Sequence, residues 1–403
     1  MQAFTPDFLM QQPSAFHAII AGLVAAFVGF ASSFPVVIQG LKAIGASDAQ
    51  AASGLMALSI AMGVAGIILS VATRLPISVA WSTPGAALLA STGAIQGGFS
   101  AAVGAFLIVA LLLIAAGLFK PLSRAVAAIP APLANALLAG VLFSLCLAPV
   151  KAMAETPAAA AAIIVVWLIV ARFKRLYATP AAAIIALGLI LWSNHGAPIG
   201  WADLAPRPLA IAPSFSLSAM ISVALPLFIV TMASQNIPGL AVLSASGYRP
   251  NPGPLIAVTG FFSLLAAPFG GHAVNLAAIT AALCASPDAH PDAGKRWIAS
   301  AANGAIYIVF GLVAGAVTKA VAGAPILIEA VAGLALLGAF ASSLGAALAE
   351  PDSREAALAT FLAAASGLSF FGIGGAFWGL VAGGAILLLN RAGAKRRPLK
   401  PTS

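Results

Sequence analysis

The chain has 403 residues, of which 62% are hydrophobic and only 7% are charged. A soluble domain carries about a quarter charged residues, so this composition excludes an ordinary soluble globule. A net charge of +9 suggests a nucleic-acid partner in a soluble protein, but here the basic residues lie in short spacers between apolar runs. Such residues set membrane topology. We therefore expect the lipid bilayer, and no nucleic acid, as a partner.

Three long runs contain no Asp, Glu, Lys or Arg, namely 75–119, 208–248 and 356–390. Each is longer than the roughly 20 residues that cross hydrocarbon once. The two cysteines, Cys146 and Cys284, lack the spacing of metal ligands, so we expect packing roles for them, no metal and no cofactor. Residues 1–15 lack the basic region of a signal peptide, so we expect no cleavable one.

Gly, Pro and Ser clusters and charged residues divide the apolar runs into fourteen candidate membrane-spanning segments. They cover approximately 16–40, 49–72, 77–93, 99–119, 125–148, 157–171, 177–193, 217–246, 254–267, 272–286, 297–318, 325–348, 356–371 and 373–390. With this count, all but four of the 19 basic residues fall on the side of the C-terminus. The positive-inside rule then places both termini in the cytoplasm, in a multi-pass inner-membrane protein.

Three pairs of similar stretches recur at a nearly constant offset of about half the chain. The pairs are 31–35 with 233–238, 76–83 with 268–275, and 124–130 with 319–325. One duplication explains them and divides the chain into repeats 1–203 and 204–403, each with seven segments. Because seven is odd, the second repeat enters the membrane inverted. Inverted repeats are typical of secondary transporters, which bind substrate near the midplane.

Segments 77–93 and 272–286 are short, and each follows a proline and an irregular polar stretch. Thr83 before Pro84 predicts a helix N-cap followed by proline at the first helical position. Asn275 occupies the equivalent position in the second repeat and predicts a second N-cap. A helix that begins inside the membrane leaves backbone N–H groups without helical partners, and lipid cannot supply them. Two such ends form a pocket suited to an anion.

The candidate substrate-binding residues lie around these two breaks and beside the prolines of segments 16–40 and 217–246. They are Ser32, Ser33, Phe34, Trp81, Ser82, Thr83, Gly85, Gln235, Asn236, His272, Asn275 and Leu276. We expect the backbone N–H groups of Gly85, Ala86, Leu276 and Ala277 to hold a carboxylate. The amides and hydroxyls would complete the polar wall, and the aromatic rings would stack near the ligand. Because these stretches contain no Asp or Glu, they favour a small aromatic carboxylate.

Three stretches resemble the benzoate:proton symporter (BenE) family, and the resemblance extends over essentially the whole chain. They are 30–35 (FASSFP), 76–85 (PISVAWSTPG) and 268–276 (PFGGHAVNL). The family is similar to the uracil and sulfate transporters, whose fold has seven plus seven inverted segments. The resemblance implies an all-α fold with short strands before half-helices in segments 3 and 10. It also implies a core of about 16–119 and 217–318 and a gate of about 125–193 and 325–390. Core would move against gate like an elevator, often in a homodimer, to import benzoate with a proton.

Uracil-type relatives carry glutamates on segments 8 and 10, where this chain has Gln235, Asn236, His272 and Asn275. This difference argues against a nucleobase and removes the obvious proton carrier. Three carriers remain: His272, whose side chain titrates near neutrality, Glu329, because ionisable groups within spans tend to be functional, and the substrate carboxylate itself. The alternatives to benzoate symport are a transporter of another organic anion or a nucleobase, and an anion channel of the same fold. We expect no enzyme, because no catalytic motif is present.

Overall fold

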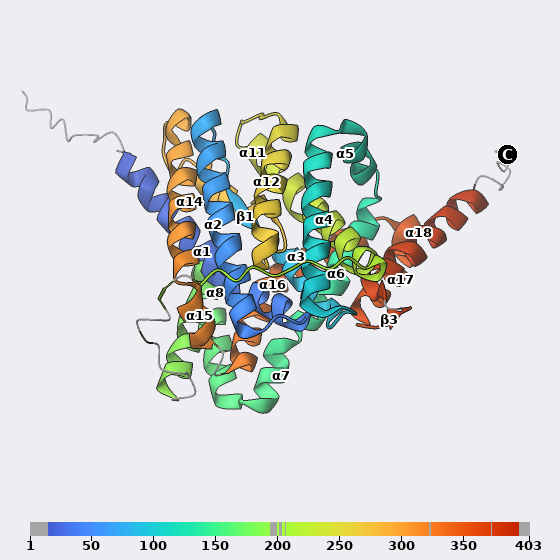
Figure 1. Cartoon of the computed structure of the whole chain (residues 1–403), viewed down its shortest axis with the longest axis horizontal. Helices are drawn as coiled ribbons and strands as arrows, with labels where there is room; N and C mark the ends of the chain where they lie inside the picture. Colours follow the sequence, from blue (N-terminus) through green and yellow to red (C-terminus); the bar gives the residue numbers. More distant parts are fainter. Residues whose placement is uncertain are drawn as a thin grey trace, which may run out of the picture.

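The computed structural model describes residues 15–193, 200, 204–205, 207–321, 324–371 and 373–394. Most of these residues are helical (Figure 1). Within the described residues, eight helices are long and apolar enough to cross a membrane, or nine if the bent pair before residue 321 is one span. The prediction of a multi-pass helical membrane protein is confirmed. The count of fourteen crossings stays a prediction, because several of the remaining segments are short or broken helices.

The first half of the chain contains one strand among its helices. Its elements are α1 (Ala15–Ala43), α2 (Asp48–Thr73), β1 (Val79–Trp81), α3 (Thr83–Thr92), α4 (Gly98–Leu118), α5 (Lys120–Ala127), α6 (Ala131–Cys146), α7 (Ala148–Glu155) and α8 (Pro157–Trp192). Helix α8 is broken at Lys174, whose φ of −145° and ψ of 85° are not helical.

The second half begins with α9 (Leu217–Ala219), α10 (Leu225–Thr231) and α11 (Ile237–Ala245), which the π-helical turns η2 (Met220–Ala224) and η3 (Met232–Asn236) join into one span. There follow α12 (Pro252–Ala266), the 3₁₀ turn η4 (Ala267–Phe269), β2 (Val274–Leu276), α13 (Ile279–Cys284), the 3₁₀ turn η5 (Ala293–Lys295), α14 (Trp297–Leu312) and α15 (Ala314–Val321). The chain ends with α16 (Pro325–Ala347), the 3₁₀ turn η6 (Pro351–Ser353), α17 (Arg354–Ala365), the short strands β3 (Ser369–Phe370) and β4 (Ile373–Gly374), and α18 (Gly375–Ala394).

The helices pack into two groups. In the first helix group, which consists of α1–α4 and α9–α14, α2 packs along α14 and α4 along α12. In the second helix group, which consists of α6–α8 and α16–α18, α6 packs against both α16 and α17. Figure 1 shows α2, α14, α12 and α4 side by side, with α17 and α18 at the right-hand edge. The groups meet where α1 and α3 contact α6, α8 and α16.

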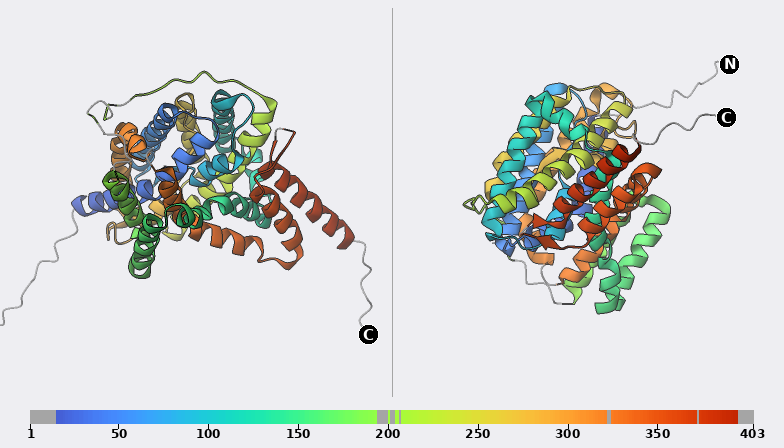
Figure 2. Two further views of the ribbon diagram at one scale, coloured as in Figure 1. Left: turned by 90° about the horizontal axis from the view of Figure 1, so that it is seen from below. Right: turned by 90° about the vertical axis from the view of Figure 1, so that its right-hand side faces the viewer.

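Residues 207–216, which lead into α9, run along the outside of the first helix group, as the left view of Figure 2 shows. Their backbone is tied to that group by hydrogen bonds from Leu209 N to Ser53 Oγ (2.9 Å) and from Ser214 N to the Ser100 carbonyl (2.9 Å). This part of the connection is therefore held on the first helix group.

The first helix group depends on glycine where α2 crosses α14. Gly63 and Gly304 face one another there, and a Cβ on either would lie 2.5 Å from the carbonyl oxygen of the other. Small residues let helix backbones approach closely in a membrane, where no hydrophobic effect draws helices together. The absence of both side chains is therefore what lets these two helices touch.

We expect Gly63→Ala to destabilise the protein, because the new methyl group would overlap the Gly304 carbonyl. Overpacking of this kind costs roughly 1–3 kcal/mol. The matched control is Gly188→Ala in α8, where an added Cβ meets nothing within 4 Å. Thermal unfolding of the detergent-purified protein should show a lower midpoint for the first variant only. Equal midpoints for the two variants would contradict the proposed contact.

Candidate substrate site

Strands β1 and β2 pair in the interior and bring the two halves of the chain together. They are antiparallel, with Val79 opposite Leu276, Ala80 opposite Asn275 and Trp81 opposite Val274. The backbone pairing continues at both ends, from Ser82 N to the Ala273 carbonyl (3.0 Å) and from Ala277 N to the Ser78 carbonyl (2.9 Å). The short strands implied before segments 3 and 10 are thus present, and each satisfies the backbone of the other.

Buried side chains complete the bonding of these strands. Asn236 Oδ1 accepts a hydrogen bond from Leu276 N (3.0 Å), and Ser263 Oγ accepts one from Val274 N (2.8 Å). His272 Nε2 lies 2.9 Å from the Ser82 carbonyl oxygen. Asn236 and His272 are fully buried. Through these contacts the polar side chains hold the two strands in place.

The predicted N-caps are corrected by the structure. Helix α3 starts at Thr83, but its N-cap is Ser82, whose Oγ accepts from Gly85 N (3.1 Å). Asn275 caps no helix, because it lies in β2 and α13 begins only at Ile279. Counted from the end of each strand, Thr83 corresponds to Ala278, so the alignment of the two repeats was displaced at this point.

The four backbone N–H groups that we expected to hold a carboxylate already have acceptors within the protein. Those of Gly85 and Ala86 bond to the Oγ and the carbonyl oxygen of Ser82. Those of Leu276 and Ala277 bond to Asn236 Oδ1 and to the Ser78 carbonyl. A bound carboxylate therefore needs other donors.

A cavity of about 260 Å³ lies where the two helix groups meet. Small-ligand sites are typically clefts of about 300–1,000 Å³, so its size is on the scale of a small ligand. Five of the predicted residues line it, all from the first helix group: Ser32, Ser33, Trp81, Thr83 and Gln235. The sequence thus located one wall of the cavity.

The other predicted substrate-binding residues do not line this cavity: Phe34, Ser82, Gly85, Asn236, His272, Asn275 and Leu276. Several of them support residues that do. Ser82 Oγ, for example, accepts a hydrogen bond from Thr231 Oγ1 (2.9 Å) as well as capping α3. The ring of Phe34 stacks on Phe30 at 5.4 Å between centroids, and Phe30 in turn contacts Trp81. Trp81 is fixed from its polar edge by a hydrogen bond from Nε1 to Ser33 Oγ (2.9 Å).

The lining residues that were not predicted include Gly29, Trp167, Arg175, Thr179, Thr280 and Tyr307. Two of them carried a signal in the sequence. Thr280 lies four residues after the distinctive 268–276 stretch, and Tyr307 is one of only three tyrosines and lies in an apolar span. Trp167, Arg175 and Thr179 belong to α8 in the second helix group, and nothing in the sequence pairs them with the strands. Among the residues that the structure describes, Arg175 is the only charged one that lines the cavity.

Glu329 lines a second cavity of about 240 Å³, together with Gln39, Lys42 and Thr318. Both cavities lie along α1 and α16, but at different levels of these helices. The α16 residues that line the first cavity are Leu334, Ala335, Gly338 and Ala339. Those that line the second are Pro325, Ile328 and Glu329, in the first turns of the helix. In the part of the chain that the structure describes, no cluster of His, Cys, Asp and Glu could hold a metal ion.

Residues 12–389 match the BenE family, described as Benzoate membrane transport protein. The chain belongs to this family. It is 40% identical over 382 residues to the inner membrane protein YdcO of Escherichia coli (strain K12), covering 94% of this chain and 97% of that protein. It is 34% identical over 375 residues to the benzoate membrane transport protein of Acinetobacter baylyi (strain ATCC 33305 / BD413 / ADP1), covering 93% and 95%. The protein is thus a BenE-family membrane transporter and not an enzyme.

The fold of this BenE-family chain is shared with solved transporters. The transmembrane domain of the cyanobacterial bicarbonate transporter BicA superimposes with a TM-score of 0.57 over 94% of this chain and 95% of that one, at 15% identity. At this identity the likeness shows the fold alone. It agrees with the predicted relation to anion transporters of the seven-plus-seven architecture.

Two neighbouring buried asparagines should differ in their effect on stability. Asn236→Ala leaves Leu276 N without its acceptor, and a buried unsatisfied donor costs roughly 1–3 kcal/mol. Asn275→Ala should cost less, because Asn275 Oδ1 has no partner and its Nδ2 bonds only to the adjacent Leu276 carbonyl. Thermal unfolding in detergent measures both. A midpoint for Asn275→Ala as low as that for Asn236→Ala would contradict the bonding described for β2.

Proposed function

We propose that this protein is an inner-membrane transporter that imports benzoate or a similar aromatic carboxylate together with a proton. The observation that carries the proposal is the chemistry of the first cavity. Its lining combines aromatic rings and hydroxyl groups with a single cation, and no Asp or Glu is among its residues. The name of the Acinetobacter baylyi relative supports benzoate as the substrate, and that of the Escherichia coli relative supports the inner membrane.

Each part of the cavity suits one part of such a ligand. Trp81 and Tyr307, with ring centroids 6.3 Å apart, offer aromatic surface for the ring of the substrate. Thr83 and Pro84 place the first turn of α3 at the cavity, and the positive end of a helix favours an anion there. Gln235 and the serines of α1 add further polar groups. The buried residues Asn236 and His272 would act indirectly, by holding β1 and β2 in place.

Transport requires that the cavity open to each side of the membrane in turn. We propose that the first helix group is the moving core and the second the gate, as the family resemblance implies. The position of the cavity between the groups supports this assignment, because its two walls come from different groups. The inverted repeat, the cytoplasmic termini and the homodimer belong to the same proposal.

Labelled benzoate should accumulate above equilibrium in proteoliposomes with an inwardly directed proton gradient. We expect accumulation to stop when a protonophore dissipates the gradient, because the gradient supplies the driving force. Uptake that is indifferent to the gradient would contradict symport. An anion channel would only equilibrate benzoate. Competition by unlabelled sulfate or uracil, stronger than by unlabelled benzoate, would favour a different substrate.

Glu329 is the side chain that we propose as the proton carrier. It is partly buried and lines the second cavity, whereas His272 is fully buried and uses one ring nitrogen to hold the strands. Glu329→Gln should abolish accumulation driven by the proton gradient but retain exchange of benzoate across the membrane. The control is Glu350→Gln, an exposed glutamate after the end of the same helix. If Glu329→Gln accumulates benzoate like the wild type, the carrier is His272 or the substrate itself.

A further inference from the structure

Arg175 approaches the first cavity from the second helix group. It ends the first half of α8, directly after the non-helical Lys174, and its side chain lines the cavity opposite the wall that includes Trp81 and Thr83. Its guanidinium lies against α16, where Nη2 is 3.5 Å from the position that a Cβ on Gly338 would occupy. The break in α8 thus brings a cation to the cavity, next to Gly338 of the neighbouring helix α16.

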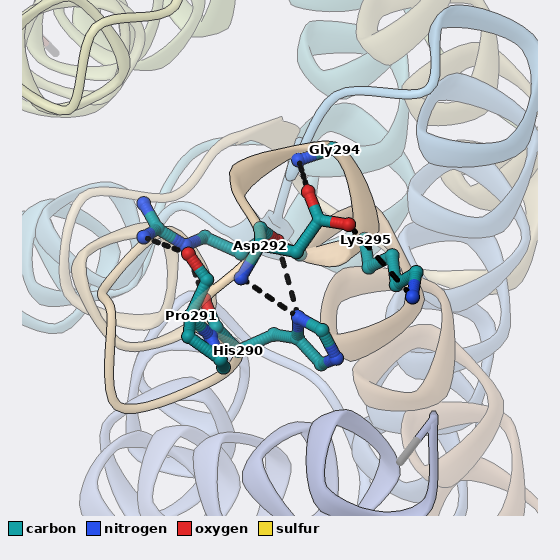
Figure 3. A network of polar contacts seen from close by, with 6 residues as sticks. His290, Pro291, Asp292, Gly294 and Lys295 are labelled. Carbon is teal, nitrogen blue, oxygen red and sulfur yellow. Dashed lines mark hydrogen bonds and ion pairs between the residues drawn. The ribbon is translucent and has the colours of Figure 1, made fainter. Parts of the chain in front are cut away.

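The guanidinium of Arg175 has no hydrogen bond or ion pair among residues 15–193, 207–321 and the other described parts of the chain. Arg296 is a useful contrast. Its buried guanidinium donates to the carbonyl oxygens of His290 (2.7 Å), Ala285 (3.0 Å) and Pro291 (3.4 Å). Figure 3 shows this turn, in which Asp292 also accepts from Gly294 N (2.8 Å). The carbonyl oxygens of its own loop thus satisfy the guanidinium of Arg296, whereas no described residue bonds to that of Arg175.

A second group on the opposite wall also lacks a partner. Thr280 lines the same cavity and is 2% exposed, and its Oγ1 makes no hydrogen bond of good geometry, although the Tyr307 hydroxyl lies beside it. A buried polar group without a partner is costly, so a hydroxyl in this state beside a cavity indicates a ligand that bonds to it. Arg175 and Thr280 are independent observations, because they come from different helix groups.

We propose that Arg175 is the countercharge that binds the carboxylate of the transported anion, with Thr280 as a hydrogen-bonding partner on the facing wall. This assignment rests on the proposed function and adds the residue that recognises the charge. A guanidinium presents two parallel N–H donors that match both oxygens of a carboxylate. The guanidinium would thus bind the carboxylate in place of the backbone N–H groups of β2 and α3. Those groups are already bonded within the protein.

The experiment measures equilibrium binding of labelled benzoate to the purified full-length protein. Arg175→Gln should raise Kd at least roughly tenfold, as expected for the loss of a charge-assisted hydrogen bond. Arg175→Lys keeps the charge but not the fork and should give an intermediate Kd. Thr280→Val should weaken binding less than Arg175→Gln. Binding of benzamide, the neutral analogue, should be the same in Arg175→Gln and the wild type, which shows that the variant retains its cavity.

The matched control is Arg172→Gln, which removes a positive charge three residues earlier in α8. Both arginines are exposed, but Arg172 does not line the cavity. It should bind benzoate like the wild type. If Arg172→Gln weakens binding as much as Arg175→Gln, the effect is one of general surface charge and the assignment is wrong. Unchanged benzoate binding by Arg175→Gln overturns the assignment alone. Absence of benzoate binding by the wild-type protein overturns the proposed substrate and the assignment with it.

Discussion

A peptide group inside a bilayer has to find its hydrogen-bond partner within the protein, and the helices before α3 and α13 give way to segments that cannot supply one from their own backbone. The structure meets this requirement by pairing the two interruptions with each other, strand β1 against strand β2. The start of α3, the position of Trp81 and the wall that Thr83 contributes all follow from this pairing. Buried side chains such as Asn236 and Ser263 bond to the outer edge of β2, so the arrangement is satisfied on both sides.

As a consequence, the polar residues of the interior fall into two groups with different roles. Those that bond to the strands are buried and already partnered on at least one side, as Ser82 and Asn236 are. Those with a free group at the cavity, Thr280 and Arg175, stand on facing walls from different helix groups. A substrate in this cavity would lie between residues of the two helix groups. Relative movement of the groups would then change its surroundings, including the charge next to its carboxylate.

The sequence predicted the parts of this site that depend on local chemistry. Thr83 followed by Pro84 located the start of α3 to within one residue, because a proline at the first helical turn is a local signal. Asn275 was misplaced because the register of β2 is set by tertiary contacts with Ser82, Asn236 and Ser263, which no local pattern contains. In the sequence, Arg175 is only one of several basic residues that lie between two apolar runs. Its place at the cavity depends on the break at Lys174 and on the packing of α8 against α16, which are tertiary features.

The pairing of β1 with β2 also bears on how the protein is made. The contact between His272 and the Ser82 carbonyl joins residues 190 positions apart. At a synthesis rate of about 5–20 residues per second, β1 leaves the ribosome roughly 10–40 seconds before its partner strand exists. During that interval the interrupted segment 77–93 has unpaired backbone groups that a bilayer cannot satisfy. Its final insertion therefore waits for the second half of the chain, which makes the substrate site one of the last regions to assemble.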